Sequence, residues 1–132
     1  QWQLNSGAGL SNLSNNTNYI GAQTSQVQIV NLSGINNGNI YKYRVSSAQG
    51  QKVRIAYTIK FTANWSGSFS NAWEDPQNWD CNVVPNQYTD VIISEGTLHP
   101  PFLNSNTTIQ SLMLRANADL NIGSGKLLLI KN

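Results

Sequence analysis

The stretch that decides the fold is residues 53–62, which read VRIAYTIKFT. Its odd-numbered positions are all apolar, and the even-numbered positions between them are mostly polar. A period of two residues is typical of a β-strand with one face on a core and the other in water. No segment of the chain keeps a helical period over three turns, because glycine and asparagine interrupt it too often. The sequence therefore predicts an all-β protein whose clearest strand is 53–62.

Two further strands are predicted on the N-terminal side of this stretch. Residues 41–45 alternate between apolar and polar, and residues 27–29 repeat the pattern over a shorter length. Turn signals rich in glycine, asparagine or glutamine separate the strands at residues 6–9, 36–39 and 49–51. The chain from Val45 to Val53 therefore predicts a hairpin with its tip near Gly50.

The composition excludes several classes of function. The 132-residue chain has a net charge of +2, and only 11% of its residues are charged, against a usual share of about 25%. So few cations exclude a nucleic-acid binder that relies on a basic face, and no apolar run approaches the roughly 20 residues of a membrane span. A single cysteine, Cys81, excludes an internal disulfide. Solubility rests on 19 Asn, 10 Gln, 14 Ser and 8 Thr, a composition common among extracellular β-proteins.

The composition and the pattern of apolar residues change after Phe61. Residues 63–85 are rich in Trp, Asn, Ser and Asp. Short apolar triplets follow at 112–114, 120–122 and 127–129, with first residues 8 and then 7 positions apart. Very short strands at such regular spacing predict the stacked rungs of a β-solenoid or a tight meander. The sequence thus predicts two domains, residues 1–62 and residues 63–132.

Several blocks of the first domain resemble an immunoglobulin-like domain of the kind repeated in large bacterial surface and secreted proteins. The blocks are residues 2–3, 5–9, 19–21, 27–29 and 37–43. The resemblance places Trp2 at the core tryptophan of the third strand, Tyr41 at the corner tyrosine and Tyr43 at the position of the strand cysteine. It implies an incomplete sandwich without the intersheet disulfide, because the first two strands would precede Trp2.

An incomplete sandwich leaves an apolar face that needs a cover, formed by Trp2, Tyr41, Tyr43 and Val53–Phe61. Two explanations are open. Either the chain is a piece of a longer protein, or a neighbouring chain inserts its strands into the gap.

The second domain is similar to another module of the same multidomain proteins, in which a W…NW…VP…DVII stretch opens a short β-solenoid. The matching segments are Trp73–Trp79, Val83–Pro85 and Asp90–Ile93. The two resemblances imply an adhesin-like cell-surface or secreted protein, and they carry no catalytic residue across. Trp73 and Trp79 are expected to cap the first rung of the solenoid. The edge beyond Ile130 is expected to be open, covered by residues that are missing from this sequence, or covered by a partner.

Acidic residues are the first candidates for chemistry. A glycosidase needs two facing acids, but Glu74 and Asp75 are adjacent and would point to opposite faces of a strand. Asp80 with Asp90 remains as a pair, although acids in such turns usually accept hydrogen bonds from local backbone N–H groups. Capping is therefore the favoured interpretation.

Metal and nucleophile chemistry have weaker support. Oxygen ligands for calcium are offered by Asp75, Asn78, Asp80, Asn82 and Asp90, but no EF-hand-like loop is present. His99 and Cys81 are 18 residues apart, and no third group is suggested that would orient the histidine. We expect no catalytic residue, no metal site and no cofactor.

Three tryptophans, Trp65, Trp73 and Trp79, fall within 15 positions. Exposed aromatic rings among amide side chains can stack on sugars, so these three are the candidate sugar-binding residues. The alternative is that the rings form core and cap, since each buries about 150–250 Å² when enclosed. Trp65 is expected to be the exposed member, because it lies in the presumed linker.

The sequence therefore predicts a non-catalytic, extracellular structural or adhesive module. Its expected partners are other copies or neighbouring domains that pair with open β-edges. Two alternatives remain: a carbohydrate-binding accessory module of a secreted enzyme, which would recognise glycans, and a filament subunit completed by strands from a neighbouring chain. Nucleic acid and membrane insertion are not expected.

Overall fold

The computed structural model of the protein describes residues 1–131, except the side chains of residues 51, 53 and 54. Within this part of the chain the regular elements are β-strands and two 3-10 helices of three residues, η1 (Gly34–Asn36) and η2 (Pro76–Asn78). Neither of these helices approaches the length and apolarity of a membrane span. The prediction of an all-β fold is confirmed.

The chain forms two compact units, unit 1 (Gln1–Ile59) and unit 2 (Lys60–Asn132). Their boundary falls inside the stretch 53–62, which the alternation of apolar residues predicts as one strand. That prediction is wrong, because the stretch is divided between β6 (Gly50–Thr58) in unit 1 and β7 (Phe61–Asn64) in unit 2. The predicted domain boundary after residue 62 lies within β7.

Different pairing partners separate these two strands. β6 pairs antiparallel with β5 (Ile40–Ser47), whereas β7 pairs parallel with β8 (Thr89–Ile93). β7 buries Ala63 between two exposed residues, whereas the described side chains of β6 are exposed. The alternation of apolar residues in the sequence nevertheless continues across the break, although the ladders do not. Periodicity alone therefore could not locate the boundary.

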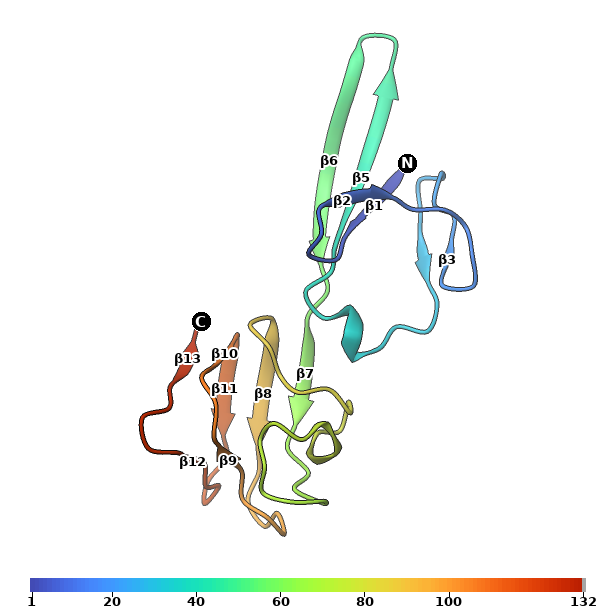
Figure 1. Cartoon of the computed structure of the whole chain (residues 1–132). Helices are drawn as coiled ribbons and strands as arrows, with labels where there is room; N and C mark the ends of the chain where they lie inside the picture. Colours follow the sequence, from blue (N-terminus) through green and yellow to red (C-terminus); the bar gives the residue numbers. More distant parts are fainter. Residues whose placement is uncertain (132) are drawn as a thin grey trace. The chain divides into compact units, whose positions relative to one another are not determined.

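Unit 1 contains a four-stranded antiparallel sheet with the order β2-β1-β5-β6 (Figure 1). Its first two strands are β1 (Trp2–Asn5) and β2 (Leu10–Asn12). A second, two-stranded sheet pairs β3 (Tyr19–Ile20) with β4 (Gln28–Ile29). Trp2 is the first residue of β1, which lies between β2 and β5 in the larger sheet.

The β5–β6 hairpin extends beyond the rest of its sheet (Figure 1). Ser47 pairs with Gly50, so two residues form the loop, as the sequence predicts for a tip near Gly50. Gly50 has a φ of 123°, a conformation that favours glycine. The Ser47 hydroxyl donates to the Gly50 carbonyl at 3.2 Å and accepts the Gln49 N–H at 3.3 Å.

The core of unit 1 is small. Four side chains are buried together: Trp2, Leu13, Ala22 and Tyr41. Trp2 and Tyr43 are register partners on β1 and β5, and their ring centroids are 5.1 Å apart. Because so few described side chains of unit 1 are buried, the face of the sheet that bears Trp2 and Tyr41 is only partly covered.

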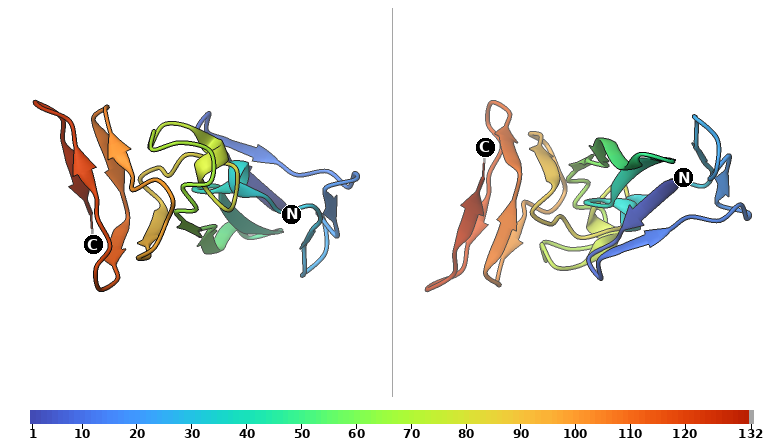
Figure 2. Two further views of the ribbon diagram at one scale, coloured as in Figure 1. Left: turned by 90° about the horizontal axis from the view of Figure 1, so that it is seen from below. Right: turned by 90° about the horizontal axis from the view of Figure 1, so that it is seen from above.

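Unit 2 is a coil of parallel strands with three faces (Figure 1 and Figure 2). One face stacks β7, β8 and β11 (Ser111–Leu114). The second stacks β9 (Phe102–Leu103) and β12 (Asn121–Ile122), and Ala72 forms a further parallel bridge to Phe102. The third stacks β10 (Thr107–Ile109) and β13 (Leu128–Ile130). This arrangement is a short parallel β-solenoid.

The rungs of the solenoid are longer than the apolar spacing suggests. Asp90 pairs with Ser111, Phe102 with Asn121, and Thr107 with Leu128, so equivalent positions are separated by 21, 19 and 21 residues. The triplets at 112–114, 120–122 and 127–129 are therefore three faces of one rung. The prediction that each triplet forms a separate rung is wrong. The spacing of 8 and 7 residues is the distance along the chain from one face of a rung to the next face of the same rung.

Corners and alternating burial build each rung. Asn117 and Gly125 take positive φ values of 60° and 71° at corners of the coil. Along β8, Thr89, Val91 and Ile93 are buried, and the residues between them are partly exposed. The last rung carries exposed apolar side chains: Met113, Leu114, Ile122, Leu127, Leu129 and Ile130.

Candidate binding surface

The three tryptophans proposed for sugar stacking are inside unit 2. Trp65, Trp73 and Trp79 are 4%, 0% and 1% exposed. Trp79 lies edge-on to both of the others, with interplanar angles of 79° to Trp65 and 77° to Trp73. Rings that are buried and steeply inclined to one another cannot present the flat platform that a sugar needs.

The prediction that Trp65 is exposed is wrong. Its Nε1–H donates to the His99 carbonyl at 2.8 Å, and its backbone forms an antiparallel bridge with Trp79. The three rings pack with Ala63, Val91 and the other buried side chains of the coil. Trp73 and Trp79 thus cover the interior beside the first rung, as expected for a cap.

The loop that carries these rings is organised by Asn78, which is fully buried. The Asn78 Oδ1 accepts the N–H groups of Phe69 and Ser70 at 3.1 and 2.8 Å. Its Nδ2 donates to the Ser70 hydroxyl and to the Ala72 carbonyl, both at 2.9 Å. An amide with four such bonds has no free lone pair for calcium, so Asn78 is a structural residue. Its role was not predicted, because an Asn in an Asn-rich loop carries no distinguishing signal.

The acidic candidates accept hydrogen bonds from the chain itself. Asp75 caps η2 by accepting the Gln77 N–H at 2.9 Å, and Asp80 accepts the backbone and side-chain N–H groups of Asn64. Asp90 accepts from the Ser111 hydroxyl. Among the described residues, no group of three or more His, Cys, Asp or Glu is placed to hold a metal ion.

Glu74, His99 and Cys81 each bond different partners. Glu74 Oε1 accepts the Asn104 N–H and the Ser105 hydroxyl, both at 2.8 Å. The His99 Nδ1 lies 2.8 Å from the Gly67 carbonyl, which identifies Nδ1 as the donor. The Cys81 thiol is directed to the Val83 carbonyl at 3.4 Å. The structure therefore gives each of these side chains a separate structural contact rather than a place in a shared reactive centre.

An apolar groove lies on unit 1, on the face that the sequence predicts to need a cover. It has a volume of about 270 Å³ and is lined by Trp2, Val27, Ile29, Tyr41, Tyr57 and Ile59. Ile29 of β4 and Val27, just before that strand, cover part of the face. Tyr57, on the outermost strand β6, is 52% exposed. The part of the predicted face formed by the side chains of Val53 and Arg54 lies outside the described residues.

Two polar features lie close to the groove. The Nε1–H of Trp2 is buried and has no hydrogen-bond partner among the described atoms, a condition that costs about 1–3 kcal/mol. The Tyr19 and Tyr41 hydroxyls lie 3.4 Å apart. Desolvation by burial, followed by this contact with Tyr41, raises the pKa of Tyr19 to about 12.

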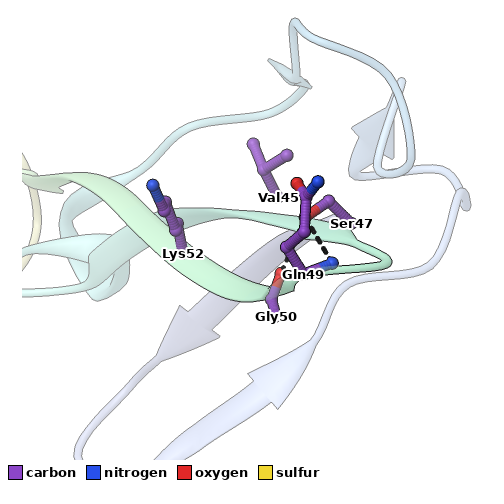
Figure 3. A pocket seen from close by; sticks show the side chains of 5 residues that line it. All are labelled: Val45, Ser47, Gln49, Gly50 and Lys52. Atoms are coloured by element: carbon purple, nitrogen blue, oxygen red, sulfur yellow. Dashed lines mark hydrogen bonds between the residues drawn. The ribbon is translucent and has the colours of Figure 1, made fainter.

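A second hollow follows the same face toward the tip of the hairpin. It has a volume of about 280 Å³ and is lined by Val45, Ser47, Gln49, Gly50 and Lys52 (Figure 3). Figure 3 shows the Lys52 and Val45 side chains on one side of the ribbon. Val45 shares its face of β5 with Tyr41, because their positions differ by an even number of residues. The two hollows therefore lie along one face of the β5–β6 ribbon.

Charge is distributed unequally between the two units. All six acidic residues of the chain are in unit 2. Unit 1 contains four cations and no acid, and the four cations, Lys42, Arg44, Lys52 and Arg54, all belong to the hairpin. This uneven distribution of charge can be read from the sequence, but the net charge of the whole chain does not reveal it.

Comparison with known proteins gives one match. A family model described as a domain of unknown function, DUF8693, matches residues 64–132, just over half of the chain. No curated protein matches the chain, and no solved structure matches it. The matched segment begins at the last residue of β7 and includes the loop of the buried tryptophans and the rungs that follow.

Proposed function

The chain belongs to the family of the domain of unknown function DUF8693, and from this premise we propose that it is a non-catalytic structural and adhesive module of a larger cell-surface or secreted protein. Unit 2 would act as a rigid spacer. Unit 1 would present a β-edge and an apolar groove to a partner.

The observation that carries the proposal is the use of the polar side chains in unit 2. Glu74, Asp75, Asp80 and Asp90 all accept hydrogen bonds that hold loops or adjacent rungs in place. Stacked rungs distribute load along a continuous ladder, and each rung contacts only its neighbours. A module of this construction suits spacing and presentation on a surface.

The rival functions receive different support. Carbohydrate binding through Trp65, Trp73 and Trp79 has no support from their geometry, because all three rings are buried. A filament subunit remains a second candidate, since β6 is the outermost strand of its sheet and can accept a strand. Polymers of the purified protein would favour the filament.

Surface labelling tests the proposed location. Intact cells that naturally produce the full-length protein are treated with a membrane-impermeant, amine-reactive biotin reagent, and biotin is then sought on peptides of this chain. We expect labelling of exposed lysines such as Lys52 before lysis, with a known cytosolic protein remaining unlabelled. Labelling of this chain only after lysis would contradict an extracellular role.

A further inference from the structure

We propose that the outer edge of β6 binds an extended acidic peptide, which adds a strand to unit 1, inserts an apolar side chain into the groove and places a carboxylate beside Lys52. The inference names a partner for the adhesive role and rests on that role only for its biological meaning. Peptide binding in solution tests the inference, and surface labelling tests the proposed function, so the two can fail separately.

The edge itself is suited to strand addition. β6 is nine residues long and outermost in the order β2-β1-β5-β6, and no described strand pairs with its outer side. Its Ile55 and Tyr57 side chains are 55% and 52% exposed. A long, apolar edge with free backbone groups is a template for another strand, and main-chain hydrogen bonds provide much of the affinity in such complexes.

The groove supplies a pocket for one side chain of the added strand. Tyr57 in β6 and Ile59, just after that strand, form one wall, and Trp2 and Tyr41 continue it across the sheet. Its volume of about 270 Å³ exceeds the roughly 150 Å³ of an engineered cavity that binds benzene. An aromatic or large aliphatic side chain therefore fits.

Charge selects the occupant. Lys52 lies opposite Val45 on the face that carries the groove, and unit 1 contains no acid to neutralise it. A second copy that paired through β6 would bring the same cations to the shared edge, and like charges across a sheet are destabilising. An acidic strand is therefore favoured over self-pairing and over a cationic strand.

Strand geometry fixes the spacing within the peptide. Tyr41 and Val45, the register partners of Tyr57 and Lys52, are four residues apart on β5, whereas Tyr57 and Lys52 are five residues apart on β6 because a β-bulge shifts the register between Lys42 and Arg44. A regular strand beside β6 would follow the spacing of β5. At about 3.3 Å per residue this separation is about 13 Å. An added strand would therefore carry its apolar residue and its carboxylate four positions apart, where both side chains point to the same face.

The experiment uses fluorescein-labelled ten-residue peptides rich in Thr and Val, with Phe and Glu four positions apart in either order, and measures binding to the whole chain by fluorescence anisotropy. We expect saturable binding for one order. Replacing Phe by Ser should weaken binding about tenfold or more, since an apolar side chain is no longer buried. Replacing Glu by Gln should weaken it about two- to fivefold, the range of an exposed ion pair.

A charge reversal with a matched control makes the test specific. Lys52→Glu should weaken the Glu peptide and strengthen a Lys peptide, whereas Lys42→Glu, on the opposite face of the same hairpin, should change both by less than twofold. Circular dichroism checks that both variants fold. Equal binding of acidic, neutral and basic peptides, no binding of any peptide, or a β6-mediated dimer that the acidic peptide does not displace would each overturn the proposal.

Discussion

The indole of Trp79 lies edge-on to that of Trp73, with ring centroids 4.7 Å apart, and donates its Nε1–H to the Trp73 carbonyl at 2.9 Å. Both side chains are almost completely buried. One contact thus combines aromatic packing with the satisfaction of a buried donor. It joins the two tryptophans of the loop to each other, and both pack in the buried core of unit 2.

Replacing Trp79 tests this contact. Trp79→Ala should lower the free energy of unfolding of unit 2 by about 3–5 kcal/mol, because it leaves a large cavity and an unpaired carbonyl. Trp79→Phe should lower it by less, since a ring remains. Hydrogen exchange of the β8 amides in urea reports on unit 2 alone. A loss below about 1 kcal/mol for the alanine variant would contradict the packing.

Asn78 provides a pH-dependent test of the loop. Asn78→Asp should lower the stability of unit 2 at pH 7 by at least about 2 kcal/mol, because a buried carboxylate cannot donate to Ser70 and Ala72. Burial raises the pKa of such a carboxyl group, so the deficit should shrink as the pH falls and the group becomes protonated.

The matched control for this variant is Asn71→Asp, at an exposed position of the same loop. Its stability should remain near that of the parent chain across the same pH range. Thermal unfolding between pH 4 and pH 7 measures both variants. Equal, pH-independent effects at the two positions would contradict the assigned role of Asn78.

Alanine substitutions at two glycines distinguish the cost of a positive φ from the cost of a steric clash with a neighbouring backbone. Gly67 and Gly96 both have positive φ values, 53° and 73°, but a Cβ at Gly67 would collide with the His99 carbonyl, whereas a Cβ at Gly96 would meet nothing within 4 Å. Gly96→Ala should therefore destabilise by about 1–2 kcal/mol, and Gly67→Ala should destabilise by clearly more. Urea unfolding compares them, and equal losses would show that the close approach at Gly67 is absent.

Tyr19 makes unit 1 sensitive to alkaline pH. Its pKa is about 12 in the folded chain and about 10 in the unfolded chain, so between these values the unfolded state releases the proton first. Stability associated with Tyr19 is complete below pH 10 and is lost as the pH rises toward 12. Tyr19→Phe should flatten this part of the profile, as measured by denaturant unfolding at each pH. An unchanged slope would contradict the burial of the hydroxyl.

The sequence predicts the strands better than it predicts their assembly. The alternation of apolar residues in 40–47 and 50–58 identifies the hairpin, because a half-buried strand needs a period of two. The same alternation continues through Phe61 although the pairing partner changes, so the unit boundary is hidden. The length of a rung was also predicted wrongly. In the sequence, three short apolar triplets on the three faces of one rung have the same appearance as three separate rungs.

Burial of the candidate site residues depended on contacts that lie far apart in the sequence. The exposure predicted for Trp65 was wrong because its partner, the carbonyl of His99, is 34 residues away. The resemblance to an immunoglobulin-like domain predicted that the face of Trp2 and Tyr41 needs a cover, and an apolar groove lined by both residues lies there. The hollow beside Lys52 was not predicted, since it depends on the hairpin's register.

Acrylamide quenching of tryptophan fluorescence in the Trp2→Phe chain tests the central claim most directly, because the remaining indoles are Trp65, Trp73 and Trp79. Because the three rings are buried, we expect them to be quenched several-fold less in the folded chain than in urea, and we expect oligosaccharides to leave the quenching unchanged. Quenching as strong in the folded chain as in urea, or protection by an oligosaccharide, would show that the rings are an exposed ligand platform and would contradict the account.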